Sequence, residues 1–411
     1  MILLLSITSI LVSALSEELF EFPKIIFLYL VTGIFLLFNK NVLKQLQNVP
    51  RAFFLWGLAI IFTNILSTIF SIDIYTSIFG YYTRFTGSLI STICFVFWMF
   101  IVATEKKRAL ILEKLTTAYL MSAVVVSILG IIQKTGVDKF LWVSDSSLRV
   151  FSTLGQPNWL AAYLIPAFFI SIAKLFQSTK NKIHLTIITI IIYTAFWFTY
   201  SASGSIALII SSLIFFVYIS KSDLKNNFKY LTAILIGIIF ISFIFLGTYK
   251  QRLIEFKNNL IPLAQAQTDD PNYVKTGDTA NIRLILWKGT YNLIKSNPKQ
   301  FLIGSGPQTF VYAFVKFRPD ELNLTSEGKL IHNKPHNWFL EILSDTGILG
   351  LTIYLGFIIY SLILFHKNAK SKDPMKIALY VGWVSLLITN FFGWPTVITY
   401  LIFFIWPVLI L

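Results

Sequence analysis

Charged residues are scarce in this chain of 411 residues, where they make up only 13% of the sequence. A soluble protein would carry about a quarter of such residues, and this scarcity excludes a soluble globular class. Cysteine is almost absent, because Cys94 is the single one. An internal disulfide and a cluster of cysteine metal ligands are therefore excluded as well. What the chain has instead is hydrophobic residues, which account for 56% of it.

The hydrophobic residues form long runs such as Phe53–Phe70, Leu89–Ala103 and Tyr230–Gly247. These runs are long enough, or nearly so, to cross a bilayer as helices. Helices are expected because a segment in lipid must satisfy its own backbone hydrogen bonds, and the short alternating segments of a membrane barrel are not seen. The middle of the runs lacks convincing Lys, Arg, Asp or Glu residues, which counts against a proton-coupled or ion-coupled transporter.

The pattern predicts an all-α polytopic membrane protein with a single transmembrane domain over residues 1–411. We interpret the N-terminal apolar run as a first span rather than a removed signal, because it has no basic start and no clear cleavage site. About twelve transmembrane helices are expected, near residues 1–15, 24–39, 52–71, 86–104, 115–133, 158–173, 185–200, 204–220, 230–247, 347–365, 377–392 and 397–411.

One long polar segment, residues 248–337, separates the ninth and tenth expected helices. This polar loop contains two of the four histidines and twelve of the thirty-four Lys and Arg residues. With both chain ends in the cytoplasm, the inner loops hold 17 Lys and Arg and the short outer segments hold 5. That asymmetry follows the positive-inside rule, so the polar loop is expected outside the cytoplasm. The same topology explains the net charge of +15 without a nucleic-acid partner.

Polar clusters at the outer boundary lead into four of the expected helices. They are Gly80–Gly87, Arg149–Asn158, Ser201–Gly204 and Pro335–Trp338. A helix N-terminus presents free N–H groups and the positive end of the helix dipole, so it is a natural anion site. Pro157 suits a first-turn position, and capping roles are expected for Ser201, Ser203 and Asn158.

Three arginines, Arg84, Arg149 and Arg283, suit this boundary to phosphate, because a guanidinium group binds phosphate oxygens in a bidentate way. Arg149 also suits contact with lipid headgroups. A helix is expected over 281–296, where Arg283 and Trp287 share a face, which leaves a surface cation–π pair as the alternative for Arg283. Further along, Gly304-Ser305-Gly306-Pro307 predicts a turn.

His336 follows Pro335 and starts a segment of strong apolar content. In the first turn of a helix the dipole would disfavour its cationic form, as a general base requires. His332 lies four residues earlier, a spacing that binds metal on a helix. Pro335 interrupts any helix between the two histidines, so no metal site is expected.

Together these residues resemble the O-antigen ligase and polymerase family of bacterial membrane glycosyltransferases. The matching pieces lie between roughly residues 80 and 360. They are Arg149 with Thr153–Asn158, Arg283 with Trp287, Gly304-Ser305-Gly306, His336-Asn337 with Glu341, and Gly347–Gly350.

The resemblance implies a metal-independent transfer without a cofactor, in which a glycan leaves undecaprenyl diphosphate on the outer face of the bacterial cytoplasmic membrane. Arginines matching Arg149 and Arg283 would hold the diphosphate, and His336 would activate an acceptor hydroxyl for an inverting attack. Supporting positions are Gln156, Asn158, Trp287 and Asn337. The acceptor is a glycan, a lipid or a protein, so ligase and polymerase both remain open.

One departure concerns the turn Ser201–Gly204, where many relatives have an arginine. Either another residue such as Arg84 supplies that charge, or the site holds its donor differently. The alternative from another class is a flippase or transporter of lipid-linked glycans. That function needs a polar route through the spans, and the spans of this chain are too apolar to suggest one.

Overall fold

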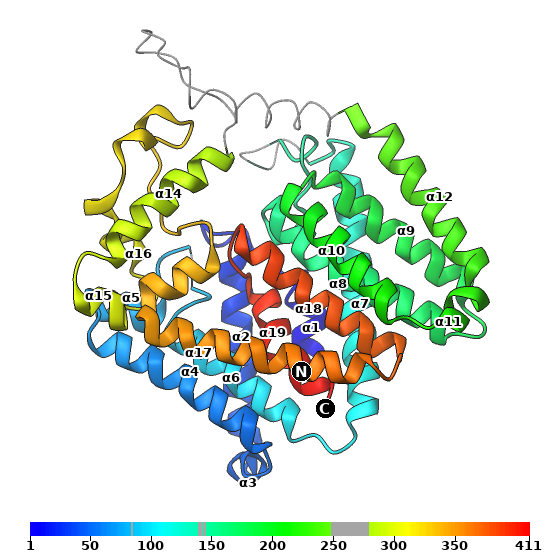
Figure 1. The fold of residues 1–411 in the computed structure, drawn as a ribbon, viewed down its shortest axis with the longest axis horizontal. Helices are drawn as coiled ribbons and strands as arrows, with labels where there is room; N and C mark the ends of the chain where they lie inside the picture. The colour runs from blue at the N-terminus through cyan, green and yellow to red at the C-terminus, as the bar shows by residue number, and fades with distance from the viewer. Residues whose placement is uncertain (84, 139–141, 143–144, 248–278) are drawn as a thin grey trace.

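The computed structural model describes the chain except for residues 84, 139–141, 143–144 and 248–278. The described residues form helices and connecting loops, with no strand among them (Figure 1). Six of these helices are long and apolar enough to cross a membrane: α2 (Glu21–Phe38), α4 (Arg51–Ile69), α7 (Arg108–Lys134), α8 (Pro157–Gln177), α17 (Trp338–Ala369) and α18 (Pro374–Phe391). Shorter apolar helices are α6 (Leu89–Ala103), α9 (Lys182–Phe198), α10 (Ala202–Tyr218), α12 (Phe228–Ile244) and α19 (Val397–Leu409). The predicted class, an all-α multi-pass membrane protein, is confirmed.

Each expected span from residue 24 onward coincides with one of these apolar helices. The first expected span, 1–15, is wrong as a continuous helix, because α1 covers only Ile2–Ile7. Beyond it, Ser13 accepts a hydrogen bond from the backbone N–H of Leu15, and Ser16 donates one to the carbonyl of Glu18. Such local bonds between serine side chains and the backbone compete with a helix.

Helix starts follow the capping chemistry of the sequence. Ser88 caps α6 and Ser201 caps α10 through side-chain oxygens that accept backbone N–H groups. Asp373 does the same for α18, with Pro374 at the first helical position. These residue types satisfy donors that a helix end otherwise leaves unpaired.

The centre of the bundle is α19, in which every residue is buried. Helix α8 is almost as enclosed and packs most extensively against α18 and α9. At the edge lies α12 (Figure 1). Ile234 is its sole buried residue, while side chains such as Phe240 and Phe243 are exposed. An apolar helix with an exposed apolar surface suits contact with lipid.

The described part of the polar loop folds around its own small apolar cluster. Its elements are α14 (Thr279–Ile294), α15 (Pro298–Ile303), α16 (Phe310–Phe314), η4 (Val315–Phe317) and η5 (Asp320–Leu324). The buried members of the cluster are Ile282, Leu286, Leu293, Phe310, Phe314 and Leu322. The expected helix over 281–296 is confirmed as α14. Short helices elsewhere are α3 (Val42–Leu46), α5 (Ile74–Phe79), α11 (Lys221–Asn226) and the 3-10 turn η2 (Ser152–Leu154).

The polar loop docks on α17 through two glycine turns. The backbone N–H groups of Ser305 and Gly306 donate to the carbonyls of Ser344 and Asp345 at 3.0 Å each. Helix α17 is kinked at Gly347, where φ is +65°. A Cβ atom there would lie 2.3 Å from the carbonyl of Leu302, so only glycine fits. The expected turn at Gly304–Pro307 is confirmed, and its glycines bring the loop against the helix that follows His336.

Candidate active site

A cavity of about 140 Å³ lies where the polar loop, through α14 and the segment before α17, meets the ends of α8 and α18. It brings together residues that are up to 245 positions apart in the chain, since Arg149 and Trp394 both line it. The lining residues are Arg149, Gln156, Asn158, Trp159, Ala162, Ile282, Arg283, Glu327, His336, Thr389, Asn390, Phe392, Gly393 and Trp394. The set includes both described arginines that the sequence singled out, and the histidine.

One side of the cavity, which we call the helix wall, consists of Arg149, Gln156 and Asn158. The guanidinium group of Arg149 donates from Nε to the carbonyl of Thr199 at 2.9 Å and from a terminal nitrogen to Oδ1 of Asn158 at 3.2 Å. The same Oδ1 accepts the hydroxyl of Ser201 at 2.8 Å. Hydrogen bonds from two other segments therefore fix the half-buried Arg149 at the cavity.

The residue that caps the N-terminus of α8 is not the one that the sequence predicted. Its capping residue is Gln156, whose side chain accepts the backbone N–H of Trp159 at 3.0 Å, and Pro157 takes the first helical position. The predicted capping role of Asn158 is wrong, because Pro157 starts the helix before it. Asn158 instead lies in the first turn with its oxygen toward Arg149. Of the two serines proposed as caps for α10, Ser201 caps the helix and Ser203 lies within it.

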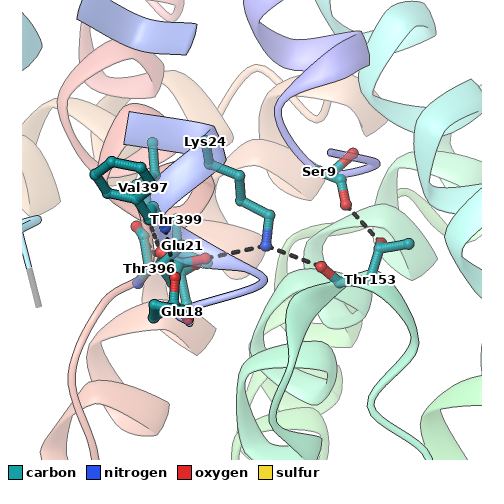
Figure 2. Close-up of polar contacts among 9 residues, drawn as sticks. Ser9, Glu18, Glu21, Lys24, Thr153, Thr396, Val397 and Thr399 are labelled. Atoms are coloured by element: carbon teal, nitrogen blue, oxygen red, sulfur yellow. Dashed lines mark hydrogen bonds and ion pairs between the residues drawn. The ribbon is translucent and has the colours of Figure 1, made fainter. Parts of the chain in front are cut away.

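A buried ion pair contacts the segment that joins Arg149 to Gln156 in the helix wall (Figure 2). Lys24 of α2 is fully buried, forms an ion pair with Glu21 at 3.0 Å, and donates to the carbonyl of Thr153 in η2 at 2.9 Å. The other oxygen of Glu21 accepts the N–H of Val397 at the start of α19 at 2.8 Å. The hydroxyl of Thr153 donates to the carbonyl of Ser9 at 2.6 Å. The segment between Arg149 and Gln156 is thus tied to α2, to α19 and to the chain after α1.

Gly155 completes this support. Its φ is +82°, and a Cβ atom there would lie 2.4 Å from the ring of Phe20. Phe20 itself packs edge-on against Phe151, with ring centroids 5.8 Å apart. The positive φ and the close approach of Phe20 explain the glycine in the Leu154-Gly155-Gln156 sequence.

The opposite side, which we call the loop wall, consists of Arg283, Glu327 and His336. Arg283 is half-buried on α14, and burial lowers its pKa while the charge of Glu327 raises it; an arginine stays protonated in either case. On the same face, Trp287 donates from Nε1 to the carbonyl of Pro335 at 3.0 Å and packs edge-on against Phe391 at 5.7 Å. Trp287 thereby holds the backbone directly before His336.

His336 lies one residue before the N-cap of α17, not in the first turn as expected. Asn337 is that cap and accepts the N–H groups of Phe339 and Leu340 at 2.9 and 3.1 Å. The φ of His336 is +55°, a conformation that few residues other than glycine adopt and that persists where the surroundings fix it. Its ring packs edge-on against Trp394, with centroids 4.9 Å apart. These contacts orient the imidazole at the cavity.

A second ion pair anchors the loop wall to α17. Lys334 and Glu341 are both buried and form an ion pair, and Gln308 donates from Nε2 to the same Glu341 oxygen at 3.2 Å. Glu341, which belongs to the family pattern, therefore has a structural contact rather than a place in the cavity lining.

Glu327 is a lining residue that the sequence interpretation missed. Its Oε2 lies 3.3 Å from Nε2 of the buried His332. The contact with His332 and the positive charges of Arg283 and of a protonated His336 lower the pKa of Glu327, against the opposing effect of burial. The only sequence signal was its position five residues before His332. Thr389, Asn390 and Trp394 were missed too, although the polar pair Thr389-Asn390 at the outer end of an expected span was a usable signal.

Two further predictions concern Arg84 and the turn Ser201–Gly204. Arg84, proposed to hold the diphosphate and to replace the missing arginine, lies outside the described residues. The turn that lacks that arginine, Ser201–Gly204, contacts the helix wall through the bond between Ser201 and Asn158. Among the residues that the structure describes, no three His, Cys, Asp or Glu side chains form a candidate metal site.

Comparison with known proteins gives one family. Residues 186–355 match the family model described as O-antigen ligase. The match runs from α9 to the middle of α17 and includes Arg283, Trp287 and His336. No curated protein matches the chain. Over these residues the match confirms the resemblance to the O-antigen ligase and polymerase family that the sequence motifs indicated.

Proposed function

We propose that this protein transfers a glycan from an undecaprenyl-diphosphate-linked donor to an acceptor hydroxyl on the outer face of the cytoplasmic membrane. The observation that carries the proposal is the shared cavity of Arg149, Arg283 and His336. Two guanidinium groups and one imidazole, contributed by three distant segments, are what a diphosphate leaving group and a hydroxyl nucleophile require. The product is a cell-surface polysaccharide, and the enzyme is a ligase or a polymerase according to its acceptor.

In the proposed reaction the acceptor oxygen bonds to the anomeric carbon while the bond between that carbon and the diphosphate oxygen breaks. The hydroxyl proton passes to His336, and the electron pair of the broken bond stays on the diphosphate. Arg149 and Arg283 stabilise the negative charge that develops there. Attack from the face opposite the leaving group inverts the anomeric configuration. No step of this scheme requires a metal ion or a cofactor.

The test is transfer by the purified protein in detergent or nanodiscs, with a defined lipid-diphosphate glycan, candidate acceptor hydroxyls and mass analysis of the products. We expect His336→Ala to lose roughly 10²-fold to 10⁴-fold in rate, the range that general base catalysis supplies. His184→Ala is the matched control, because His184 is exposed at the start of α9 and remote from the cavity lining.

The outcome also separates an enzyme from a flippase. If cells with the His336→Ala protein still build outer-face glycan of unchanged chain length and linkage, the enzymatic proposal centred on His336 is wrong. A flippase would then be favoured, and transport of a labelled lipid-linked glycan across vesicles would be the next measurement.

A further inference from the structure

Glu327 has the wrong charge for a cavity that holds diphosphate. Among the described residues that line the cavity it is the sole carboxylate, beside Arg149, Arg283 and His336. A carboxylate repels an anionic ligand, so it weakens donor binding where it stands. Its presence there calls for a role at a different stage from the binding of the diphosphate.

The proposed reaction creates such a stage at His336. When the acceptor hydroxyl gives its proton to the imidazole, a third positive charge forms in a small cavity that already holds two guanidinium groups. A carboxylate nearby offsets that charge, as the acidic member of a catalytic triad does for its histidine. Glu327, His336 and Arg283 line the same cavity of about 140 Å³, and the positive charge of a protonated His336 lowers the pKa of the Glu327 carboxyl group.

We propose that Glu327 is the electrostatic partner of His336, and that its carboxylate stabilises the imidazolium formed when His336 accepts the acceptor proton. This role rests on the proposed function. The proton remains on His336 until the product leaves, and Glu327 stays ionised throughout. Glu327 is thus a positioning and charge-stabilising residue that acts through His336.

His332 gives the geometry for this role. It is buried, and its Nε2 lies 3.3 Å from Oε2 of Glu327. A carboxylate held by a buried neighbour keeps its orientation toward the cavity, in the way that second-sphere partners orient reacting groups. The competing interpretation is that Glu327 and His332 only fasten the polar loop. In that case removal of either partner would have the same effect.

The experiment compares Glu327→Gln, Glu327→Asp and His332→Asn in the full-length protein, with kcat, the donor KM and the pH–rate profile as readouts. For Glu327→Gln we expect kcat to fall roughly 10²-fold, the low end of the contribution of general acid–base catalysis. The donor KM should stay equal or decrease, because a repelling charge is removed. The acidic limb of the pH–rate profile should move to lower pH, since an imidazolium without its carboxylate loses its proton more easily.

Glu327→Asp keeps the charge and should recover most of kcat, and His332→Asn should leave the acidic limb in place. Equal losses in Glu327→Gln and His332→Asn with an unmoved limb would overturn the role and favour a loop fastening. Wild-type kinetics in Glu327→Gln would overturn it as well, while the proposed function would stand. Absence of transfer by the wild-type protein would instead overturn the proposed function and this role with it.

Discussion

The two walls of the cavity are held by different kinds of interaction. In the helix wall, Arg149 bonds to a backbone carbonyl and to the amide oxygen of Asn158, and a buried lysine stands behind it. In the loop wall, Arg283, Glu327 and His336 are charged or titratable groups that act on one another. The helix wall is therefore built from contacts that do not change during a reaction, whereas the loop wall contains the groups whose charge can change.

This difference suggests a division of labour. A diphosphate needs a fixed, always-positive partner, which the helix wall offers at the N-terminus of α8. Proton transfer needs a group that titrates, which the loop wall offers at the entrance to α17. The loop wall is not loose, because Trp287 and the ion pair between Lys334 and Glu341 hold the backbone around His336. Variants that weaken one wall at a time can test whether the division is real.

The largest effect is expected for Lys24→Met behind the helix wall. The change leaves the carboxylate of Glu21 buried without its cation and the carbonyl of Thr153 without its donor. Breaking a buried ion pair by removing one partner costs about 3–5 kcal/mol. We expect a large fall in the unfolding temperature of the purified protein, together with loss of donor binding.

The matched control is the double variant Lys24→Met with Glu21→Gln, because Gln still offers an oxygen to the N–H of Val397 and carries no charge. It should recover much of the stability that the single variant loses. If both variants are as stable as the wild type, the buried pair does not support the helix wall. The statement that fixed contacts hold this wall would then be wrong for Lys24.

The sequence predicted the parts of each wall that depend on local pattern. Apolar runs predicted the helices from residue 24 onward, and the turn residues Gly304 and Gly306 predicted the turn that docks on α17. The places of Arg149, Arg283 and His336 near helix ends followed from the predicted helix boundaries, and the three residues line one cavity. Local pattern failed after α1, where Ser13 and Ser16 form hydrogen bonds with nearby backbone groups and the helix does not continue.

What local pattern cannot predict is a contact between distant segments. Lys24 is one of the five basic residues counted in the short outer segments, and no local signal pointed to its partner Thr153, which lies 129 positions away. Glu327 was not singled out by the sequence, because its place beside Arg283 in the cavity lining depends on how the loop folds around its own apolar cluster. The sequence did not predict a role for Trp394 for the same reason, because its contact with His336 joins the polar loop to the turn before α19.

The next effect compares the two arginines directly. Arg149→Lys and Arg283→Lys both keep the charge but lose the bidentate fork, and a hydrogen bond to a charged group is worth about 1.5–3 kcal/mol. Donor affinity should therefore fall roughly 10-fold to 100-fold in each. Only Arg149→Lys should also lower the unfolding temperature, because Arg149 bonds to Thr199 and Asn158 within the helix wall.

The measurements are donor binding and thermal unfolding in the same detergent. Arg51→Lys, at the exposed start of α4, is the control that should change neither. Equal losses of stability in the Arg149 and Arg283 variants would show that the two walls are supported alike, contrary to the comparison.

The smallest effect is a pH dependence confined to the loop wall. The pKa of Glu327 is lowered in the folded protein from its ordinary value of 4.5, first by the contact with His332 and then by neighbouring charges. Ionised Glu327 therefore contributes stability that is fully present above about pH 4.5 and is lost as the pH falls through the lower folded value. For a partly exposed group the contribution is below about 1 kcal/mol.

Hydrogen exchange over residues 320–337, corrected for intrinsic rates, should be faster at about pH 3 than at about pH 6, on either side of the ordinary glutamate pKa. In Glu327→Gln the difference between the two pH values should be smaller, and what remains belongs to Glu321, whose pKa is lowered by its hydrogen bond with Lys288. A difference as large as in the wild type would mean that the charge of Glu327 does not hold the loop wall.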